Sequence, residues 1–401
     1  MNIGLFTDTY FPQVSGVSTS IQLLYQQLKL DGHNVTIFTT TDPNQRDDEV
    51  DLVRLPSIPF ISFDDRRVAV AGFDKALKIA REKELDIVHT HTEFSLGLAG
   101  RYVASRFKIP TVHTYHTMYE NYTHYIWNGL IIQPYHVKVL SRLYCQHTDG
   151  VIAPSNMTKV TLEEYGIKSP IEVIPTGITL PVIDKEKSNK LREELGIHPE
   201  ERVLLSLSRL SKEKKIDQVI QAYYDVAKVI PLTRLVIVGD GPERQTLENQ
   251  VKQLNIPSVN FIGEVPHCKV KYYYQMADLY VNASESESQG LTYLESIGNG
   301  TPIIAKQNDY LKSIMENSDY GQLYQKSNEL VDVLVNYLNM LDRGMYTGIS
   351  QEQLESISAE RFAEHVIEFY DKVIASSDKQ QMNIFERVQN GVKDILRDIK
   401  L

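Results

Sequence analysis

Cysteine is scarce in this chain of 401 residues, which contains only Cys145 and Cys268, far apart in sequence. Two isolated cysteines form neither a disulfide framework nor a ligand-like spacing, and this favours a reducing compartment. No apolar run approaches the roughly 18 residues that a membrane-spanning helix needs. The chain begins directly with a strand pattern, without a charged leader or a cleavage site, so we expect no signal peptide. These absences predict a cytoplasmic protein.

Positive charge is also in deficit, because 42 Lys and Arg stand against 52 Asp and Glu. This balance argues against general nucleic-acid binding. The deficit is reversed between residues 97 and 160, which carry six Lys or Arg and two acids. We therefore expect one basic face on an otherwise acidic globular protein, which is long enough for two domains.

Apolar strand patterns alternate with amphipathic helix patterns along most of the chain. Strands are expected at 2–7, 35–40, 86–89, 111–115, 150–153 and 171–174, and again at 202–207, 234–238, 259–262, 279–282 and 302–305. Such alternation predicts an α/β fold of two Rossmann-like domains, with sites at the carboxyl ends of parallel strands. We place these domains at 1–180 and 200–379, with a linker between them. An apolar stripe in 380–401 predicts a terminal helix.

One stretch, residues 284–302, combines the features of a ligand site. It follows an apolar strand pattern, and apolar residues recur at helical spacing after Gly290. This places Glu287 in a strand-to-helix loop and Glu295 on the helix. Amides at a helix start suit a diphosphate, and carboxylates accept hydrogen bonds from sugar or ribose hydroxyls. The alternative interpretation is two glutamates on a solvated loop and helix face.

The two glutamates, with seven residues between them including Gly290 and Leu291, resemble the signature of retaining GT-B glycosyltransferases of the family 4 type. The sequence from Glu287 to Glu295 is most similar to that of bacterial diacylglycerol α-glucosyltransferases, although Asn-Ala-Ser replaces the Pro-Ser that usually precedes the motif. The resemblance implies a GT-B architecture with an interdomain cleft and a C-terminal helix that crosses back to the first domain. It assigns Glu287 to the transferred sugar, and Gly290, Leu291 and Glu295 to the nucleotide.

Two cations follow the first expected strand of the second domain. Arg209 and Lys214 match the family pattern of Gly-Arg-Leu, two residues and Glu-Lys-Gly, whereas Ser208 and Lys215 replace its glycines. Cations at this position can neutralise a leaving diphosphate, and the alternative is a solvated, lysine-rich turn. The resemblance also assigns Gly16, in the first strand-to-helix loop, to the donor diphosphate, although the family usually has two consecutive glycines there.

Histidines cluster near the ends of two expected neighbouring strands, as His89 and His91 and as His113 and His116. A metal site is therefore a rival interpretation, but the spacing matches no zinc framework. We expect no metal, and structural roles for His89 and His113. The resemblance aligns His116 with a histidine that faces the donor sugar, where a neutral imidazole or its backbone carbonyl stabilises positive charge. Glu120 is a candidate for orienting the acceptor hydroxyl.

The segment 119–144 mixes aromatic, aliphatic and basic side chains and holds the only tryptophan. This composition suits the headgroup region of an anionic bilayer, and the wording again resembles diacylglycerol glucosyltransferases. The alternative is a core-facing helix. We expect a protein that is peripheral to the inner face of the cell membrane.

The predicted reaction is transfer of glucose from UDP-glucose to diacylglycerol with retention of the α configuration, without a cofactor. One alternative is addition of a second hexose, glucose or galactose, to a glycosyl-diacylglycerol, and another is a soluble sugar acceptor. A nucleotide-sugar-binding protein without turnover is an alternative from another class. An incomplete glycine pattern at 239–241 makes an NAD-dependent dehydrogenase a more distant one.

Overall fold

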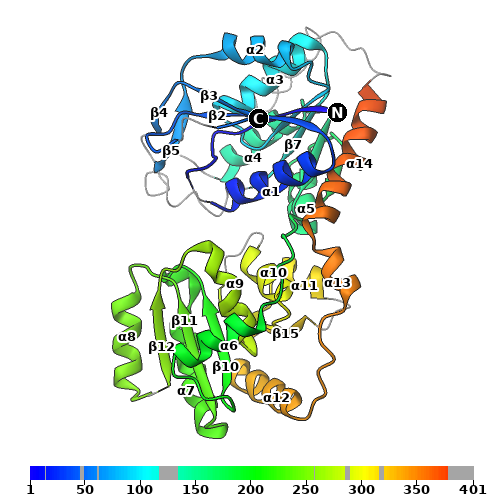
Figure 1. Ribbon diagram of the computed structural model, residues 1–401. Helices are drawn as coiled ribbons and strands as arrows, with labels where there is room; N and C mark the ends of the chain where they lie inside the picture. Colours follow the sequence, from blue (N-terminus) through cyan, green and yellow to red (C-terminus); the bar gives the residue numbers. More distant parts are fainter. Residues whose placement is uncertain are drawn as a thin grey trace. The chain divides into compact units, whose positions relative to one another are not determined.

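The computed structural model describes residues 1–13, 15–45, 49–60, 63–116, 134–256, 258–284, 290–315 and 320–377. The chain divides into two compact units (Figure 1). Unit 1 is Met1–Gly177 together with the chain from Ala359 onward, and unit 2 is Ile178–Ser358. Among the described helices, none combines the length and the apolar character needed to cross a membrane.

In its described residues, unit 1 contains a seven-stranded parallel sheet of order β3-β2-β1-β6-β7-β8-β9. Its strands are β1 Asn2–Phe6, β2 Asn34–Thr40, β3 Leu52–Leu55, β6 Ile87–Thr90, β7 Thr111–Thr114, β8 Gly150–Ala153 and β9 Ile171–Val173. β4 Ser57–Phe60 and β5 Phe63–Ala69 form a separate antiparallel pair. The sequence pattern does not predict β3, β4 and β5, because these strands are short or rich in charged residues.

Helices cover both faces of this sheet because side chains alternate along each strand. Ile3 and Leu5 of β1 pack in one apolar cluster with helices α1 Gly16–Leu30 and α14 Ala359–Ser377. Phe6 packs on the other face with α2 Phe73–Glu82 and α3 Ser95–Phe107. Strands β8 and β9, the last two of this sheet in chain order, contribute to a smaller apolar cluster with α4 Pro134–Cys145 and α5 Asn156–Glu164.

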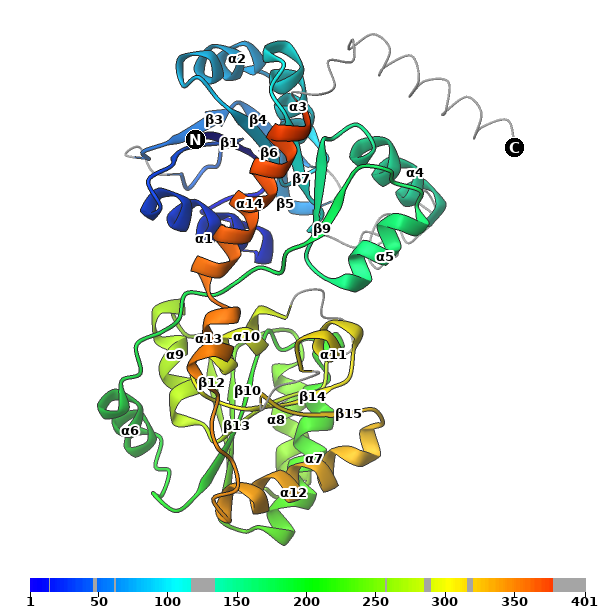
Figure 2. The same cartoon turned by 90° about the vertical axis from the view of Figure 1, so that its right-hand side faces the viewer.

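Helix α14 is the segment that returns to unit 1 from the C-terminal part of the chain. The domain bounds predicted from the sequence include residues 359–377 in the second domain, whereas α14 packs beside α1 (Figure 2). The reason is its apolar face, which includes Phe369 and Val373 and contacts the first sheet. The terminal helix predicted at 380–401 lies outside the described residues.

The described part of unit 2 contains a six-stranded parallel sheet of order β12-β11-β10-β13-β14-β15. Its strands are β10 Arg202–Leu207, β11 Thr233–Val238, β12 Val259–Gly263, β13 Leu279–Asn282, β14 Ile303–Lys306 and β15 Gly321–Tyr324. Counted within the unit, the order is 3-2-1-4-5-6, the doubly wound order of Rossmann folds. In such sheets ligands bind where the order reverses, which here is between β10 and β13.

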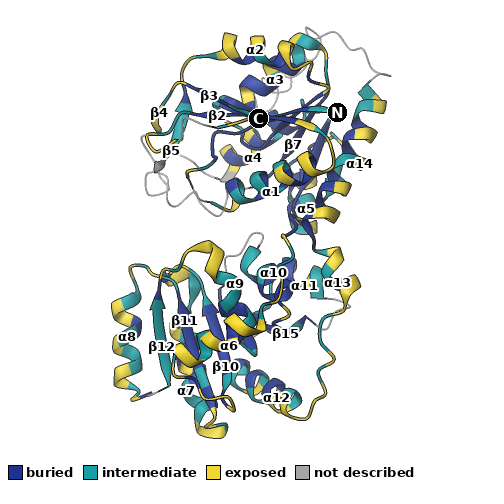
Figure 3. Ribbon diagram, viewed as in Figure 1, coloured by how far each residue is buried: buried dark blue, intermediate teal, exposed yellow. Residues whose placement is uncertain are grey.

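The second sheet is also covered on both faces. One apolar cluster joins it to α7 Ile216–Val229, α8 Arg244–Gln253 and α12 Leu330–Asp342. The other joins it to α9 His267–Met276, α10 Leu291–Gly298 and α11 Asp309–Met315. The stretch expected as a linker contains a helix, α6 Lys185–Glu194, which packs against α9. Figure 3 shows buried strands and exposed outer faces of the helices.

Candidate active site

In unit 2, the loops that follow β10 and β13 are joined where the strand order reverses. The Tyr280 hydroxyl donates a hydrogen bond to the carbonyl of Leu207 (3.1 Å), which ends β10. The Ser284 hydroxyl donates to the carbonyl of Glu213 (3.4 Å). These contacts fix the loop that carries the two predicted cations against the loop that leads to α10.

The first of these loops carries positive charge. Arg209 is exposed and makes no ion pair within the described residues, and Lys214 ends the short 3₁₀ helix η3 Lys212–Lys214. Glu213 lies between these two cations in the chain, and burial alone would raise the pKa of its carboxyl group. This pKa is nevertheless lowered by a hydrogen bond from Ser211, by a backbone amide, and by the charges of Lys214 and Arg209. The local potential therefore favours an anion.

The glycine turn at 239–241 supports the Arg209 loop. Gly239 has φ 126°, and a Cβ on it would lie 1.9 Å from the carbonyl oxygen of Ser208. A Cβ on Gly241 would lie 2.4 Å from the carbonyl oxygen of Leu210, whose amide donates to the carbonyl of Asp240 (3.0 Å). Both glycines thus allow close backbone packing, which explains the incomplete dinucleotide pattern as scaffolding.

Helix α10 starts at Leu291 without a side-chain cap. Its N-cap is Gly290, with φ 52°, and a Cβ there would lie 2.3 Å from the Tyr293 ring. Only glycine fits this position comfortably. No side chain of the described residues caps the helix. The Tyr293 amide donates to the carbonyl of Gly290 (2.8 Å), whereas the amides before it, at the positive end of the helix dipole, suit a phosphate.

Glu295 lies on α10 and is oriented by two side chains of α9. The Tyr274 hydroxyl donates to its Oε2 (3.2 Å), and His267 Nε2 lies 3.6 Å from its Oε1. The hydrogen bond to Glu295 raises the pKa of His267, against the effect of burial. The carboxylate is one-quarter exposed, so it can still accept from a ligand hydroxyl. Neither Tyr274 nor His267 is predicted from the sequence, because their contact with Glu295 depends on how α9 packs against α10.

In unit 1, the histidines meet at the carboxyl ends of β6 and β7, as expected. His89 Nδ1 lies 2.6 Å from the Tyr370 hydroxyl, and its Nε2 lies 2.7 Å from the Thr114 hydroxyl. His113 Nδ1 lies 3.0 Å from the carbonyl oxygen of Thr90, and its Nε2 lies near Glu93. Both rings use both nitrogens inside the protein, as a structural role requires.

His116 is buried and uncharged. Its Nε2 lies 3.0 Å from Nδ1 of His91. Burial, followed by the neighbouring His113, lowers the pKa of His116 to about 3. A neutral imidazole is the form that the resemblance requires beside a sugar carbon that gains positive charge. No three His, Cys, Asp or Glu within the described chain gather in a geometry that could hold a metal ion.

Unit 1 also has a buried carboxylate, Asp8, that the sequence pattern does not predict as a functional residue. It follows β1 and accepts hydrogen bonds from the hydroxyls of Thr92 and Ser95 and from the amide of Leu96 (3.1 Å). Burial raises the pKa of Asp8, and these three donors oppose the rise. Asp8 therefore caps helix α3 and joins the ends of β1 and β6. Its position in the first loop was the only indication in the sequence.

Gly16 is exposed at the start of α1. A Cβ there would meet nothing within 4 Å, so packing of the described residues does not require glycine. This fits a position where a ligand approaches the backbone. The predicted residues Glu287 and Glu120 lie outside the described residues, as do residues 119–133 of the proposed membrane segment.

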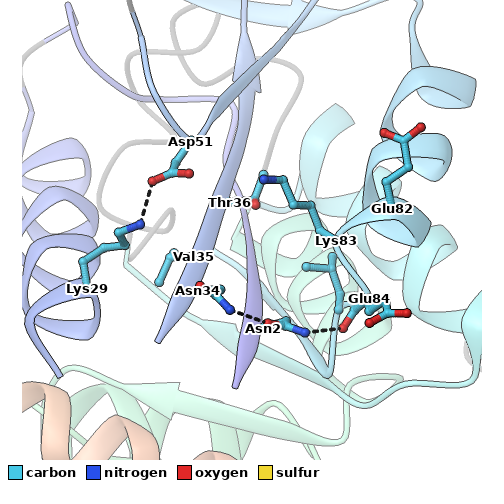
Figure 4. A pocket seen from close by; sticks show the side chains of 10 residues that line it. Asn2, Lys29, Asn34, Val35, Thr36, Asp51, Glu82, Lys83 and Glu84 are labelled. Atoms are coloured by element: carbon cyan, nitrogen blue, oxygen red, sulfur yellow. Dashed lines mark hydrogen bonds and ion pairs between the residues drawn. The ribbon is translucent and has the colours of Figure 1, made fainter. Parts of the chain in front are cut away.

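A pocket lies at the opposite, amino-terminal ends of β1 and β2 in unit 1. Asn2, Asn34 and Glu84 line it, together with an ion pair between Lys29 and Asp51 (2.9 Å). Figure 4 shows this ion pair, a hydrogen bond from the Asn34 amide to Asn2, and one from the Asn2 amide to the backbone carbonyl of Glu84. None of the predicted site residues lines this pocket.

Two family models match the chain: "Glycosyltransferase Family 4" over residues 14–180 and "Glycosyl transferases group 1" over residues 187–341. The alpha-monoglucosyldiacylglycerol synthase of Streptococcus pneumoniae is 47% identical over 388 residues, which are 95% of this chain and 88% of that protein. This chain belongs to the family 4 glycosyltransferases. The Acholeplasma laidlawii protein of the same name is 33% identical over 84% of this chain and 88% of its own length.

Solved glycosyltransferase structures share the fold of this family 4 chain. Sucrose-phosphate synthase from Thermosynechococcus elongatus has a TM-score of 0.70 at 20% identity, over 94% of this chain and all of that one. Anabaena HepE in complex with UDP and glucose has a TM-score of 0.72 at 17% identity, over 93% of this chain and all of that one. The predicted GT-B fold and the predicted enzyme class, a hexosyltransferase, are confirmed.

Proposed function

We propose that this glycosyltransferase moves glucose from UDP-glucose to diacylglycerol and forms an α-glucosyl-diacylglycerol. The acceptor is supported by two relatives that are named alpha-monoglucosyldiacylglycerol synthases and that match most of this chain. The observation that carries the donor half is the pair of joined loops in unit 2. There the exposed Arg209 and the uncapped start of α10 follow adjacent strands at the reversal of strand order.

The donor nucleotide binds unit 2 in this proposal. Arg209 and Lys214 neutralise the leaving diphosphate, a kind of contact worth about 3 kcal/mol in a transition state. The amides at Gly290 and Leu291 donate to the phosphates, and Glu295 accepts from hydroxyls of the ribose. Glu287 is assigned to the transferred sugar and Gly16 to the diphosphate. Because protein cations serve the diphosphate, we expect turnover to need no metal.

Retention of configuration is proposed to follow front-face attack. The acceptor oxygen attacks the anomeric carbon on the face from which UDP departs, while the bond from that carbon to the diphosphate oxygen breaks. The freed phosphate oxygen takes the acceptor proton, and Glu120 orients the acceptor hydroxyl. Neutral His116 stabilises positive charge on the sugar, which the low pKa of its imidazole supports.

The membrane is proposed to meet unit 1 through the segment 119–144. Within it, α4 buries Val137 and Tyr144 but exposes Tyr135 and Leu140 beside the exposed Lys138. Exposed apolar and basic side chains on one helix suit an anionic headgroup region. We therefore propose a peripheral protein of the inner membrane face.

A labelled-donor assay tests the proposal. The full chain is mixed with a panel of UDP- and GDP-sugars and with micelles that contain diacylglycerol, glucosyl-diacylglycerol or no lipid acceptor. We expect turnover with UDP-glucose and diacylglycerol, an α anomer in the product, and no loss on addition of EDTA. Transfer only to glucosyl-diacylglycerol would identify the second glycosylation step instead. Equal turnover on a soluble sugar without lipid would contradict a lipid acceptor.

A further inference from the structure

Two buried imidazole nitrogens at the carboxyl edge of the first sheet have no hydrogen-bond partner among the described residues. They are His91 Nε2 and His116 Nδ1, in side chains of residues that are 4% and 8% exposed. Buried polar atoms are nearly always paired, so an unpaired couple at one place needs a physical reason. The hydrogen bond between the other two nitrogens of these rings supplies that reason.

His91 Nδ1 and His116 Nε2 bond to each other at 3.0 Å, and the two rings lie 27° from parallel. Burial and the neighbouring imidazoles keep the pKa of both rings low, so both are neutral. In a pair of neutral imidazoles one ring donates and the other accepts. The direction of this bond therefore sets which nitrogen of His116 carries its proton.

His91 is itself held in place by a contact with His89. Its ring packs against that of His89, with centroids 4.0 Å apart and the ring planes tilted by 35°. His89 in turn is fixed between the hydroxyls of Tyr370, on α14, and Thr114, on β7. A chain of contacts thus runs from α14 through His89 and His91 to His116.

We propose that His91 is a positioning residue for His116, whose ring orientation and tautomer it fixes through the bond between them. Nothing else within the described residues selects the tautomer, because Nδ1 of His116 has no partner there. The inference rests on the proposed function, in which His116 faces the transferred sugar. A fixed tautomer would present that sugar with one defined hydrogen-bonding group during every turnover.

Two amide substitutions in the full chain separate positioning from simple packing. In His91→Asn the amide reaches the place of Nδ1 and can restore the bond, whereas in His91→Gln it reaches the place of Nε2 and cannot. We expect the Gln variant to lower kcat for glucosyl transfer about tenfold with an unchanged KM for UDP-glucose, less than the loss of a direct transition-state donor. The Asn variant should stay near wild type. Equal activity of the two variants would overturn the proposal.

Side-chain spectra of ¹⁵N-histidine-labelled protein give a readout that does not depend on turnover. We expect one tautomer of His116 in the wild type and in His91→Asn, and a mixture of tautomers in His91→Gln. An unchanged His116 spectrum in the Gln variant would also overturn the proposal.

A double substitution distinguishes this inference from the proposed function. If His116→Ala alone leaves transfer unchanged, the proposed role of His116 is wrong, and so is the positioning role that depends on it. If His116→Ala lowers transfer, His91→Gln should cost nothing further in that background, because its effect passes through His116. An equal further loss would show that His91 acts independently and would contradict only the positioning role.

Discussion

The carboxyl edges of the two sheets have the same β/α construction but differ in charge. In unit 1, the side chains of His89 and His91 at this edge are buried. Desolvation lowers the pKa of both imidazoles, so they are uncharged. In unit 2 the corresponding edge exposes Arg209, and cationic neighbours help to lower the pKa of Glu213. The fold fixes where side chains gather, while burial decides whether they carry charge.

Removing the exposed cation should give the largest effect. We expect Arg209→Ala to lower kcat/KM for UDP-glucose about 100- to 1,000-fold, because the leaving diphosphate loses a charged donor. The melting temperature should not change, since Arg209 is exposed. Steady-state kinetics and calorimetry measure the two quantities. The matched control is Lys212→Ala, which removes a nearby exposed cation without an assigned role. An equal loss in that variant would show that the loop acts through its overall positive charge and not through a specific contact of Arg209.

At the carboxyl edge of the unit 1 sheet, the buried carboxylate of Asp8 should contribute to stability. We expect Asp8→Ala to lower the free energy of unfolding by about 2–3 kcal/mol, because the donors on Thr92, Ser95 and Leu96 lose their acceptor. Denaturant titration measures this change. Asp74→Ala, at an exposed helix start, is the control and should cost less than about 0.5 kcal/mol. Equal costs would show that burial of Asp8 contributes nothing.

The two predicted glycines should respond differently to the same substitution. Gly290→Ala places a Cβ against the Tyr293 ring at φ 52°, and we expect a loss of about 1–2 kcal/mol of stability together with activity. Gly16→Ala meets no atom within 4 Å, so stability should hold while the KM for UDP-glucose rises. Thermal unfolding and donor titration test the pair. A Gly16→Ala protein with an unchanged KM would exclude a diphosphate contact at Gly16.

Near neutral pH, the smallest expected effect is the dependence of stability on pH. The pKa of His267 is raised by Glu295, so the stabilising pair is complete below the unfolded pKa near 6.5 and is lost as pH rises through the folded value. His116 behaves oppositely: its pKa is lowered to about 3, so stability falls as pH drops from about 6.5 toward 3. Unfolding curves across pH should show both slopes. His267→Gln should flatten only the upper one, and loss of the lower slope in this variant would contradict the assignment.

The sequence predicted the central strands of both sheets because their apolar runs are local features. It did not predict β15 or the helix α6, whose own residues give weak patterns, nor the short strands β3 to β5. Arg209, Lys214, Gly290 and Glu295 were predicted as site residues from their resemblance to family motifs, and the structure places them on the loops and helix at one strand-order reversal. That reversal depends on pairing between strands far apart in the chain, which local periodicity does not contain.

By itself, the sequence determined which residue types end each strand and begin each helix, since periodicity and motif spacing are written within a few turns of chain. Only the tertiary structure decided which of them touch. Tyr274 and Glu295 meet across 21 positions, Asp8 and Leu96 across 88, and His89 and Tyr370 across 281. Such contacts arise when helices and strands bury their apolar faces together, and this burial also sets the protonation of the histidines at the first sheet edge.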